Sequence, residues 1–484
     1  MKRSWITFIC ILLCVLIPFA AVASVILFLP SQFKNTFLGA LEIKMERIES
    51  IEGQKIVIIG GSSVPFGIDS KQMEKMLGMP VVNFGLYATL GTKLMLDLSR
   101  DYIKEGDIVV IAPETDAQTY SLFFGAEAAW QAADADLSLL PKIAKDNFGA
   151  MLGGAWRYAA QKLKYSLSAH SLDPEGVYNA SSFDEYGDII YPRDYNKMEL
   201  MYDSSLEIRL SKDIVSREFI DYVNEYVESA NKKGAKVLFS FAPMNMDALS
   251  ADVTLEMIAE FESFIAENFA SELISDPNAY IYESGYFYDS NFHLNNAGAV
   301  MHTANLAHDI ADALGMEIII DYEAPDMPEI PADIEPEFPT DYDENEKYFV
   351  FEEHKVGGEL RGYNIVGLTE LGKAQASLTT PVAYNGMRVY NIKEGAFTGS
   401  VAAVDIYVTE NIASIGDGAF AGAESLKKVH ILADDPNTTT VNNITMGLLS
   451  GLASGAKFYV SSASYDEYIS NYFWGPYASR IVAE

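Results

Sequence analysis

Cysteine is nearly absent from this 484-residue chain, and the only two, Cys10 and Cys14, stand close to the N-terminus. The remainder therefore has no disulfide and no thiol nucleophile, so covalent chemistry there depends on oxygen or nitrogen groups. Basic residues are also scarce, with 34 Lys and Arg against 68 Asp and Glu. The resulting net charge of −34 excludes nucleic acid as a partner, because no basic patch dominates such a surface.

Charged residues are missing from the stretch Trp5 to Pro30, which follows Lys2 and Arg3. An apolar run of this length predicts a membrane-spanning anchor over residues 1–31, followed by a juxtamembrane helix over 32–54. The basic N-terminus predicts a single-pass protein of the bacterial cell membrane, with most of the chain extracytoplasmic. A cleaved signal peptide ending at Ala21-Val22-Ala23 is the alternative.

Residues 55–320 carry the pattern of a doubly wound α/β domain with a parallel sheet. Apolar, β-branched runs at 55–59, 81–85, 107–112 and 235–242 predict buried strands, and a shorter strand is expected near 280–282. Helical patterns cover 71–77, 92–103, 216–232, 255–269 and 297–314. Alternation of strands and helices predicts helices on both faces of the sheet. Residues 117–209 interrupt the pattern and are interpreted as a partly helical insertion, a candidate lid over the substrate.

A composition change marks a boundary at residues 321–346. This segment holds five prolines and eleven acidic residues without any Lys or Arg, which predicts an extended linker. Beyond it, 390–399 (YNIKEGAFTG) matches 413–422 (ASIGDGAFAG) at a period of 23 residues, and a strand-like stretch follows each copy. A repeat of this period with one short strand per copy predicts a leucine-rich-repeat solenoid over residues 347–484.

Two places carry candidate chemistry. The first strand runs directly into Gly60-Gly61-Ser62-Ser63, which places two hydroxyls at the carboxyl end of a strand, where ligands bind in open α/β sheets. His293 precedes the last helix of the same domain, four residues after Asp289, so the carboxylate is able to orient the imidazole. Ordinary helix caps explain either motif taken alone.

Other polar residues receive weaker roles. Glu114 and Asp116 follow the third strand without a nearby His, which is more typical of solvated or capping residues than of an acid/base pair or a metal site. Asn245 follows the fourth strand and is a candidate to stabilise an oxyanion, whereas Ser63 is the alternative nucleophile to Ser62. No metal site and no cofactor are predicted.

Taken in chain order, these blocks resemble the SGNH (GDSL-like) hydrolase superfamily, of the membrane-anchored type, over about residues 55–314. Gly60-Gly61-Ser62 is similar to the block that carries the nucleophile, and Asn83-Phe84-Gly85 to the block whose glycine N–H faces the oxyanion. The family's third block supplies an Asn to the oxyanion hole, where this chain has 112–116 (APETD).

The resemblance implies that Ser62 is the nucleophile, His293 the base and Asp289 the acid, with Gly85 beside the oxyanion. It implies an ester hydrolase or O-acyltransferase that acts on an acyl ester of a cell-wall glycan, an exopolysaccharide or another cell-surface polymer. The repeats resemble BspA-like leucine-rich repeats of bacterial surface proteins. They favour an alternative, a catalytically degenerate adhesion protein whose repeats bind a protein or glycan ligand.

Overall fold

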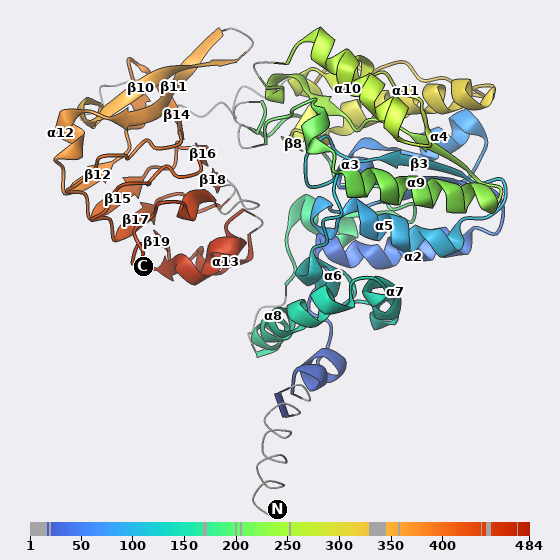
Figure 1. Ribbon diagram of the computed structural model, residues 1–484, viewed down its shortest axis with the longest axis horizontal. Helices are drawn as coiled ribbons and strands as arrows, with labels where there is room; N and C mark the ends of the chain where they lie inside the picture. Colours follow the sequence, from blue (N-terminus) through green and yellow to red (C-terminus); the bar gives the residue numbers. More distant parts are fainter. Residues whose placement is uncertain are drawn as a thin grey trace, which may run out of the picture. The chain divides into compact units, whose positions relative to one another are not determined.

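The structure, a computed structural model, describes residues 17–18, 21–167, 172–198, 201–203, 206–250, 253–328, 345–356, 359–436, 438–441, 447–471 and 473–484. The chain divides into two compact units (Figure 1). Unit 1 comprises Met1–Met201 with Ile208–Glu329, and unit 2 comprises Tyr202–Glu207 with Ile330–Glu484. Most of the expected linker falls on residues 329–344, which lie outside the described residues.

Unit 1 is built on a five-stranded, wholly parallel sheet in the order β2-β1-β3-β4-β6. The strands are β1 (Ile56–Gly60), β2 (Val81–Gly85), β3 (Ile108–Ala112), β4 (Lys236–Phe239) and β6 (Glu272–Leu273). The first three strands are buried along their whole length, as continuous apolar runs of parallel sheets require. The prediction of a mixed α/β fold with parallel sheets is confirmed.

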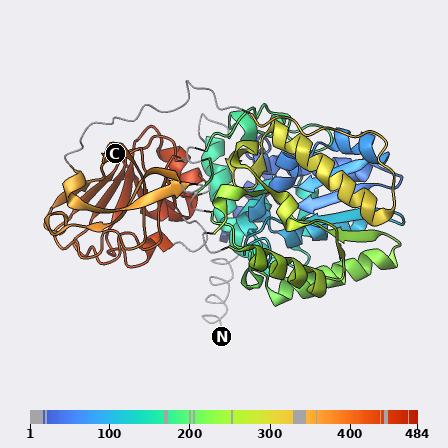
Figure 2. The ribbon, with the colours of Figure 1, turned by 90° about the horizontal axis from the view of Figure 1, so that it is seen from above.

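Helices cover both faces of this sheet. On one face lie α4 (Ser70–Leu77) and α11 (Asn296–Leu314), which pack on Ile56, Ile58 and Val110 (Figures 1 and 2). On the other lie α5 (Thr92–Ser99) and α9 (Arg217–Lys232). The remaining helices of unit 1 are α2 (Leu41–Ser50), α3 (Ser63–Gly67), α6 (Ala126–Ala132), α7 (Leu140–Ala144), α8 (Phe148–Leu167) and α10 (Leu255–Asn268).

Short strands outside the main sheet depart from the expectation. Residues predicted as a strand near 280–282 form β7 (Ile281–Tyr282), which pairs with β5 (Met244–Asn245) instead of joining the sheet. The fifth main-sheet strand is β6, two residues with no apolar run that a sequence pattern could detect. A hairpin of β8 (Phe287–Ser290) and β9 (His293–Leu294) precedes α11.

Only part of the described N-terminal apolar run packs on protein, since Ile17, Leu27 and Phe28 are exposed. Ile26 is 6 % exposed and belongs to a cluster with Phe33 and Tyr158, and Lys162 Nζ donates to the Ile26 carbonyl. Among the described residues, no helix is both long and apolar enough to cross a membrane.

The predictions of a transmembrane helix over 1–31 and of a single-pass location at the bacterial cell membrane are therefore wrong. An apolar run looks the same in sequence whether lipid or protein covers it. Residues 1–16 and 19–20, including Cys10 and Cys14, lie outside the described residues. The helix expected after the anchor corresponds to α2, which is preceded by a 3₁₀ turn at Phe37–Ala40 and buries Leu41, Met45 and Ile48.

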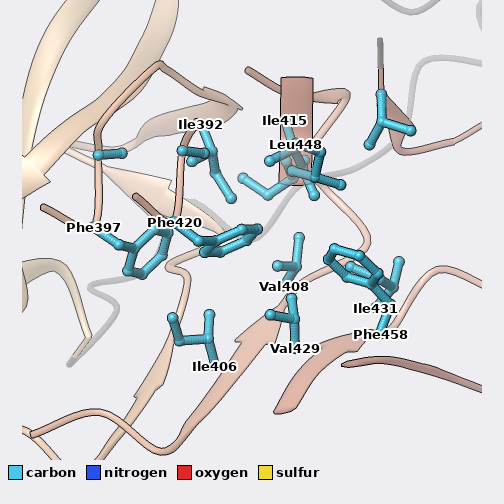
Figure 3. Packing of buried hydrophobic residues seen from close by; sticks show 14 of the residues in the cluster. Ile392, Phe397, Ile406, Val408, Ile415, Phe420, Val429, Ile431, Leu448 and Phe458 are labelled. Atoms are coloured by element: carbon cyan, nitrogen blue, oxygen red, sulfur yellow. The ribbon is translucent and has the colours of Figure 1, made fainter. Parts of the chain in front are cut away.

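Unit 2 stacks its strands at a regular offset in two sheets. One has the order β12-β15-β17-β19-β20 and is parallel throughout. The other has the order β10-β11-β14-β16-β18, with β13 added beside β14; its β10–β11 and β13–β14 pairs are antiparallel and its other pairs are parallel. Residues 23 apart become strand partners, as in Ile406 with Val429 and Asn391 with Ser414. Phe397 and Phe420, equivalent positions of the two repeats, stack with ring centroids 5.1 Å apart inside the core (Figure 3).

The strands of unit 2 are β10 (Phe349–Val356), β11 (Glu359–Leu368), β12 (Ser377–Thr379), β13 (Ala383–Tyr384), β14 (Met387–Ile392), β15 (Asp405–Val408), β16 (Ser414–Ile415), β17 (Lys428–Ile431), β18 (Thr440–Val441), β19 (Lys457–Val460) and β20 (Ile481–Ala483). Two short helices, α12 (Glu370–Lys373) and α13 (Tyr465–Ser470), accompany them.

Candidate active site

Ser62 lies on a tight turn between β1 and α3, and two glycines make this turn possible. A Cβ atom on Gly60 would approach the Ala112 carbonyl oxygen to 2.3 Å, and one on Gly61 would approach Glu114 Oε1 to 2.7 Å. Close packing against the loop after β3, and not a positive φ, is therefore what requires glycine here. Because β1 sits between β2 and β3, the turn occupies the switch point of the sheet, where ligands of such folds bind.

A continuous hydrogen-bonded relay joins Ser62, His293 and Asp289. Ser62 Oγ is 2.8 Å from His293 Nε2, and His293 Nδ1 is 2.8 Å from Asp289 Oδ1. With Nδ1–H donating to the carboxylate, Nε2 offers its lone pair to the serine hydroxyl. Ser62 and His293 are only 4 % and 6 % exposed, so little water competes for these bonds.

The spacing of four residues between Asp289 and His293 is a consequence of the β8–β9 hairpin. Ser290 pairs directly with His293 across the hairpin, and the turn between them consists of Asn291 and Phe292. The hairpin thereby brings the carboxylate of Asp289 and the imidazole of His293 into contact across this spacing of four residues.

Two aromatic side chains hold the relay in place. The Phe66 ring stacks on the His293 ring with centroids 3.8 Å apart and an interplanar angle of 4°. The Tyr178 hydroxyl donates to Asp289 Oδ2 over 2.8 Å, which leaves Oδ1 for the histidine. Tyr178 comes from the insertion at 117–209, so this segment contributes directly to the site.

The two residues expected to donate to an oxyanion, Gly85 and Asn245, differ in their distance from the serine turn and in their contacts. Gly85 ends β2 directly beneath the serine turn, where a Cβ would lie 2.4 Å from Val64 Cβ and 2.6 Å from the Gly61 carbonyl oxygen. The amide of Asn245 is committed elsewhere, since Nδ2 donates to the Met201 carbonyl and Oδ1 accepts from the Asp247 N–H. Asn245 is therefore not brought to Ser62 by its hydrogen bonds.

Ser63, the alternative nucleophile, points into a different environment. Its hydroxyl is buried and has no hydrogen-bond partner among the described residues, whereas its backbone N–H donates to Glu114 Oε1 over 2.8 Å. The structure brings the hydroxyl of Ser62, and not that of Ser63, to the imidazole.

Glu114 is the residue at this site that sequence reasoning missed. It was interpreted as solvated or capping, yet it is only 4 % exposed, and Oε1 lies 3.2 Å from Ser62 Oγ. A signal was present: it follows β3 at the point where the SGNH pattern has its third block. An ionised carboxylate would disfavour negative charge about 4 Å away by roughly 4 kcal/mol at an effective dielectric constant of about 20.

Asp116 extends this acidic loop. Its Oδ1 accepts hydrogen bonds from the N–H groups of Gln118, at 2.7 Å, and Thr119, at 3.1 Å. Burial, reinforced by the charge of Glu114, raises the pKa of Asp116 to about 7.

A buried polar network supports the floor of the site. Asn83, on β2, donates to the Val64 carbonyl over 3.1 Å and to Asp188 over 2.8 Å, and it accepts from Lys44 Nζ over 3.0 Å. Burial lowers the pKa of Lys44 to about 7 and raises that of Asp188 to about 7. These bonds tie the serine helix α3 to α2 and to the insertion.

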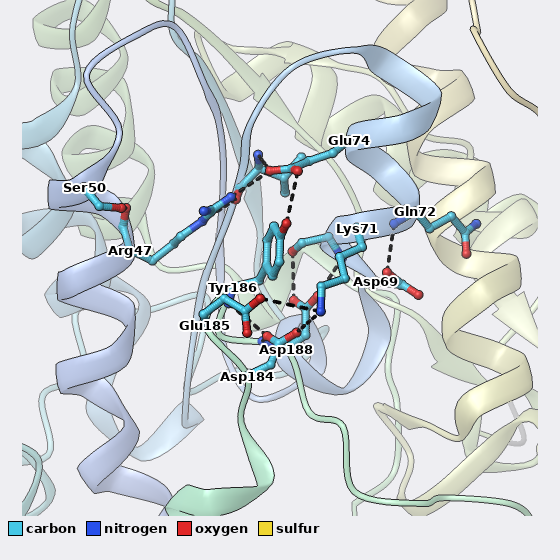
Figure 4. A network of polar contacts seen from close by, with 12 residues as sticks. Arg47, Ser50, Asp69, Lys71, Gln72, Glu74, Asp184, Glu185, Tyr186 and Asp188 are labelled. Atoms are coloured by element: carbon cyan, nitrogen blue, oxygen red, sulfur yellow. Dashed lines mark hydrogen bonds and ion pairs between the residues drawn. The ribbon is translucent and has the colours of Figure 1, made fainter.

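The rim of the same network is drawn in Figure 4. Asp188 accepts from the Ser70 N–H over 2.6 Å at the start of α4. Lys71 lies 3.4 Å from Asp184, and Arg47 pairs with Glu74 at 2.7 Å. The insertion is thus attached to α2 and α4 by charged groups as well as by burial.

Metal-binding residues do not cluster here: within the described ranges no group of three His, Cys, Asp or Glu side chains is placed to hold an ion. What the site offers is a serine with a base, an acid that orients the base, and a second carboxyl group against the serine.

Unit 1 is a doubly wound parallel α/β unit and unit 2 a stack of short repeats. No protein-family model matches the chain, and neither does any curated protein. A solved structure of a leucine-rich-repeat protein from T. pallidum is similar to 24 % of this chain at 20 % identity, with a TM-score of 0.18. The match spans about half (55 %) of that protein's length.

Proposed function

We propose that unit 1 is an SGNH-type serine ester hydrolase or O-acyltransferase. The relay from Ser62 through His293 to Asp289, with both hydrogen bonds at 2.8 Å, is the observation that carries this proposal. The strand order β2-β1-β3-β4-β6 supports it, because the relay stands at the switch point of that sheet.

In the proposed reaction Ser62 Oγ attacks the ester carbonyl while His293 Nε2 takes the serine proton. Asp289 stabilises the imidazolium that forms, and the backbone N–H groups of Ser62 and Gly85 are the proposed oxyanion donors. The Gly85 N–H donates to Asn83 Oδ1 over a long 3.4 Å in this structure and would turn from it to the oxyanion. His293 then protonates the leaving alcohol, which leaves an acyl-serine. A water molecule or an acceptor hydroxyl gives its proton to His293 and attacks the acyl group, and His293 returns this proton to Ser62 Oγ as the acyl–serine bond breaks.

We propose an acyl ester carried by a glycan or a similar hydroxyl-rich polymer as the substrate. A cavity of about 520 Å³ in the insertion supports this, since it is lined by carboxylates, amides and hydroxyls of Asp173, Glu175, Asn179, Ser181, Ser182 and Tyr191. Gly176 and Asn179, which also line it, flank Tyr178, the tyrosine that contacts Asp289.

The first experiment follows hydrolysis of p-nitrophenyl acetate by the full chain and its Ser62→Ala, His293→Ala and Ser63→Ala variants. We expect the first two substitutions to abolish turnover above the solvent rate. Ser63→Ala is the matched control, one residue away and without contact to the imidazole, and it should retain activity.

Labelling with a fluorophosphonate, followed by mapping of the modified peptide, assigns the nucleophile. A label on Ser62 that disappears in His293→Ala supports the proposal. A label on Ser63, or a wild-type rate equal to that of Ser62→Ala with no labelled serine, contradicts it.

A second candidate function is that of a binding protein. In this case unit 1 has no catalytic activity and the repeats of unit 2 bind a ligand. Three in-register side chains favour it: the ring of His430 stacks on Tyr407 at 4.2 Å and lies 5.2 Å from Tyr459 across adjacent strands. His430 is itself only 5 % exposed, so the half-buried Tyr407 and Tyr459 are the rings of this row that a ligand would contact. Under this candidate, Tyr407→Ala weakens capture of a glycan-array ligand whereas Ser62→Ala does not.

A further inference from the structure

One buried amide, that of Asn83, contacts both segments that carry the proposed oxyanion donors. Asn83 lies on β2, two residues before Gly85, and its Oδ1 is 3.4 Å from the Gly85 nitrogen. Its Nδ2 donates over 3.1 Å to the carbonyl of Val64, in the helix α3 that begins directly after Ser62. A single side chain therefore joins the strand end that carries one donor to the turn that carries the other.

The amide of Asn83 uses its full hydrogen-bonding capacity. A primary amide has two N–H donors and an oxygen that accepts two bonds. Nδ2 donates to Val64 and, over 2.8 Å, to Asp188 Oδ1. Oδ1 accepts from Lys44 Nζ over 3.0 Å and from the Gly85 N–H over the longer distance. Asn83 is 0 % exposed, so bulk water does not reach these groups.

The chemistry of its partners fixes which way this amide faces. A backbone carbonyl accepts and never donates, so the nitrogen of Asn83 must face Val64. The oxygen then faces Lys44, whose amino group donates. Lys44 Nζ also donates to the Gly187 carbonyl, which holds the lysine in place. A rotated amide would lose both contacts, so the observed orientation is the one that the surroundings allow.

The two donor segments also touch each other, which makes their spacing sensitive to this amide. A Cβ on Gly85 would lie 2.4 Å from Val64 Cβ and 2.6 Å from the Gly61 carbonyl oxygen, so the end of β2 rests against the serine turn. The turn is closed by the Phe66 N–H, which donates to the Ser62 carbonyl over 3.1 Å. A displacement of Val64 therefore displaces Ser62 as well.

We infer that Asn83 is a positioning residue, which holds the backbone N–H groups of Ser62 and Gly85 at the separation that one oxyanion requires. The inference rests on the serine hydrolase function proposed above. Oxyanion donors are effective because they are in place before negative charge develops. Oδ1 already accepts from Lys44 at 3.0 Å, so its bond to the Gly85 N–H stays long and is readily exchanged for a bond to the oxyanion.

The test compares two substrates that differ only in the atom that becomes the oxyanion. It measures kcat/KM of the full chain for p-nitrophenyl acetate and for its thiono analogue, in which sulfur replaces the carbonyl oxygen. Sulfur accepts hydrogen bonds weakly, so well-placed N–H donors favour the oxygen substrate. The ratio of the two values does not depend on the fraction of folded protein, because both substrates meet the same preparation.

Asn83→Ala should lower kcat/KM for p-nitrophenyl acetate about 100-fold, as a displacement of about 1 Å at a reacting group does. The value for the thiono substrate should fall far less, so the ratio should fall. Asn83→Asp has the same size but cannot donate to Val64, and its carboxylate binds the Gly85 N–H more strongly than an amide oxygen does. It should lower the ratio as well.

Asn196→Ala is the matched control. The amide of Asn196 is also buried, but it donates to the carbonyls of Met201 and Ser284 instead of to the serine turn. This substitution removes a buried amide from unit 1 and should leave the ratio of the two substrates unchanged.

Two results overturn the role of Asn83: an unchanged kcat/KM in Asn83→Ala, or a fall that is equal for the two substrates. The second would mean that the amide supports folding and not the oxyanion site. Fluorophosphonate labelling separates these results from failure of the hydrolase proposal. If Ser62 of the wild type is labelled and turnover depends on it, only the role of Asn83 is at stake; if Ser62 is inert, the hydrolase proposal itself fails.

Discussion

The two units of this protein bring distant residues together in opposite ways. In unit 2 the partners repeat at a fixed offset, so Ile406 meets Val429 and Phe397 meets Phe420, each 23 residues along the chain. In unit 1 the decisive contact joins Ser62 to His293, 231 residues apart. One arrangement is encoded by a period and the other by the order of strands in a sheet.

Because of this difference, we expect a substitution in unit 2 to lower stability and a substitution of a relay residue in unit 1 to lower activity. A core residue of the repeats is packed by its neighbours on both sides, so its loss weakens a stack. A relay residue of unit 1 is held by its hairpin and by Phe66, so under the proposed function its replacement should remove activity while leaving the sheet intact. The predictions that follow test this separation, starting with the largest effect.

The largest effect is expected for Asp289→Asn. The amide cannot accept the Nδ1 proton as the carboxylate does, so His293 adopts the wrong tautomer toward Ser62. Loss of the orienting carboxylate lowers kcat by about 1,000- to 10,000-fold. Steady-state hydrolysis measures the rate and a thermal melt measures stability, which should be unchanged.

Asp146→Asn, at an exposed position of the insertion, is the matched control for the same chemical change. If Asp289→Asn lowered the melting temperature enough to unfold unit 1 under the assay conditions, the rate loss would come from unfolding. That result would contradict the separation of activity from stability in unit 1.

A core substitution in the repeats should do the reverse. Phe420 is fully buried and stacks on Phe397, so Phe420→Ala should destabilise unit 2 by about 3 to 5 kcal/mol. Urea unfolding followed by hydrogen exchange of each unit measures this, and Ser62-dependent hydrolysis should be retained. Val401→Ala, at a 71 % exposed position, is the control and should change little.

The fold was predictable wherever the signal lies within a short stretch. The apolar run at Ile56–Ile59 predicted β1, and the Gly-Ala-Phe repeat predicted residues that later pair strand to strand. The N-terminal run was misinterpreted because lipid and the side chains around Ile26 select for the same residues. Strand β6 was missed because a strand of two residues is too short to show an alternation of apolar and polar residues.

The site was less predictable because its members meet only through topology. Ser62, His293 and Asp289 were chosen by chain order and resemblance, and their roles remain a proposal for the experiments above. The burial of Glu114 depends on Gly61 lying across it, a contact between two loops 52 residues apart that neither loop reveals alone. The partners of Asn245 were hidden for the same reason, since its amide bonds to Met201 and Asp247; its oxyanion role stays an untested prediction.

Each unit also contains a buried histidine whose protonation opposes folding. Burial lowers the pKa of His302, on α11, to about 3, and it lowers that of His354, on β10, to about 4. The unfolded chain has a histidine pKa near 6.5, so it binds the proton first as the pH falls. Stability from each group is therefore complete above pH 6.5 and is lost on acidification toward the folded-state value.

Between pH 7 and pH 4 unit 1 should lose about 3 kcal/mol through His302. Urea unfolding at both pH values measures the loss, and His302→Gln, which can still accept from the Tyr282 hydroxyl, should remove most of it. His354→Gln should act on unit 2 alone. An equal effect of either substitution on both units would contradict their independence.

The smallest predicted effect tests the link between the insertion and the relay. Burial and the charge of Asp289 raise the pKa of Tyr178 well above its ordinary value, so its hydroxyl remains a donor throughout the assay range. Tyr178→Phe removes the 2.8 Å bond to Asp289 Oδ2, which makes the carboxylate a stronger partner for His293. A charge-assisted bond contributes up to about 3 kcal/mol, and we expect only roughly a threefold change in kcat/KM because the imidazole bond survives.

The informative readout for Tyr178→Phe is the acid limb of the pH profile of kcat/KM. Loss of the tyrosine bond strengthens the bond between Asp289 and the imidazole, so this limb should move to higher pH. Tyr186→Phe is the matched control, because this tyrosine of the same insertion contacts Glu74 and not Asp289. If both variants move the limb equally, the insertion acts by general packing; if only Tyr178→Phe does, it acts on the relay through that single hydroxyl.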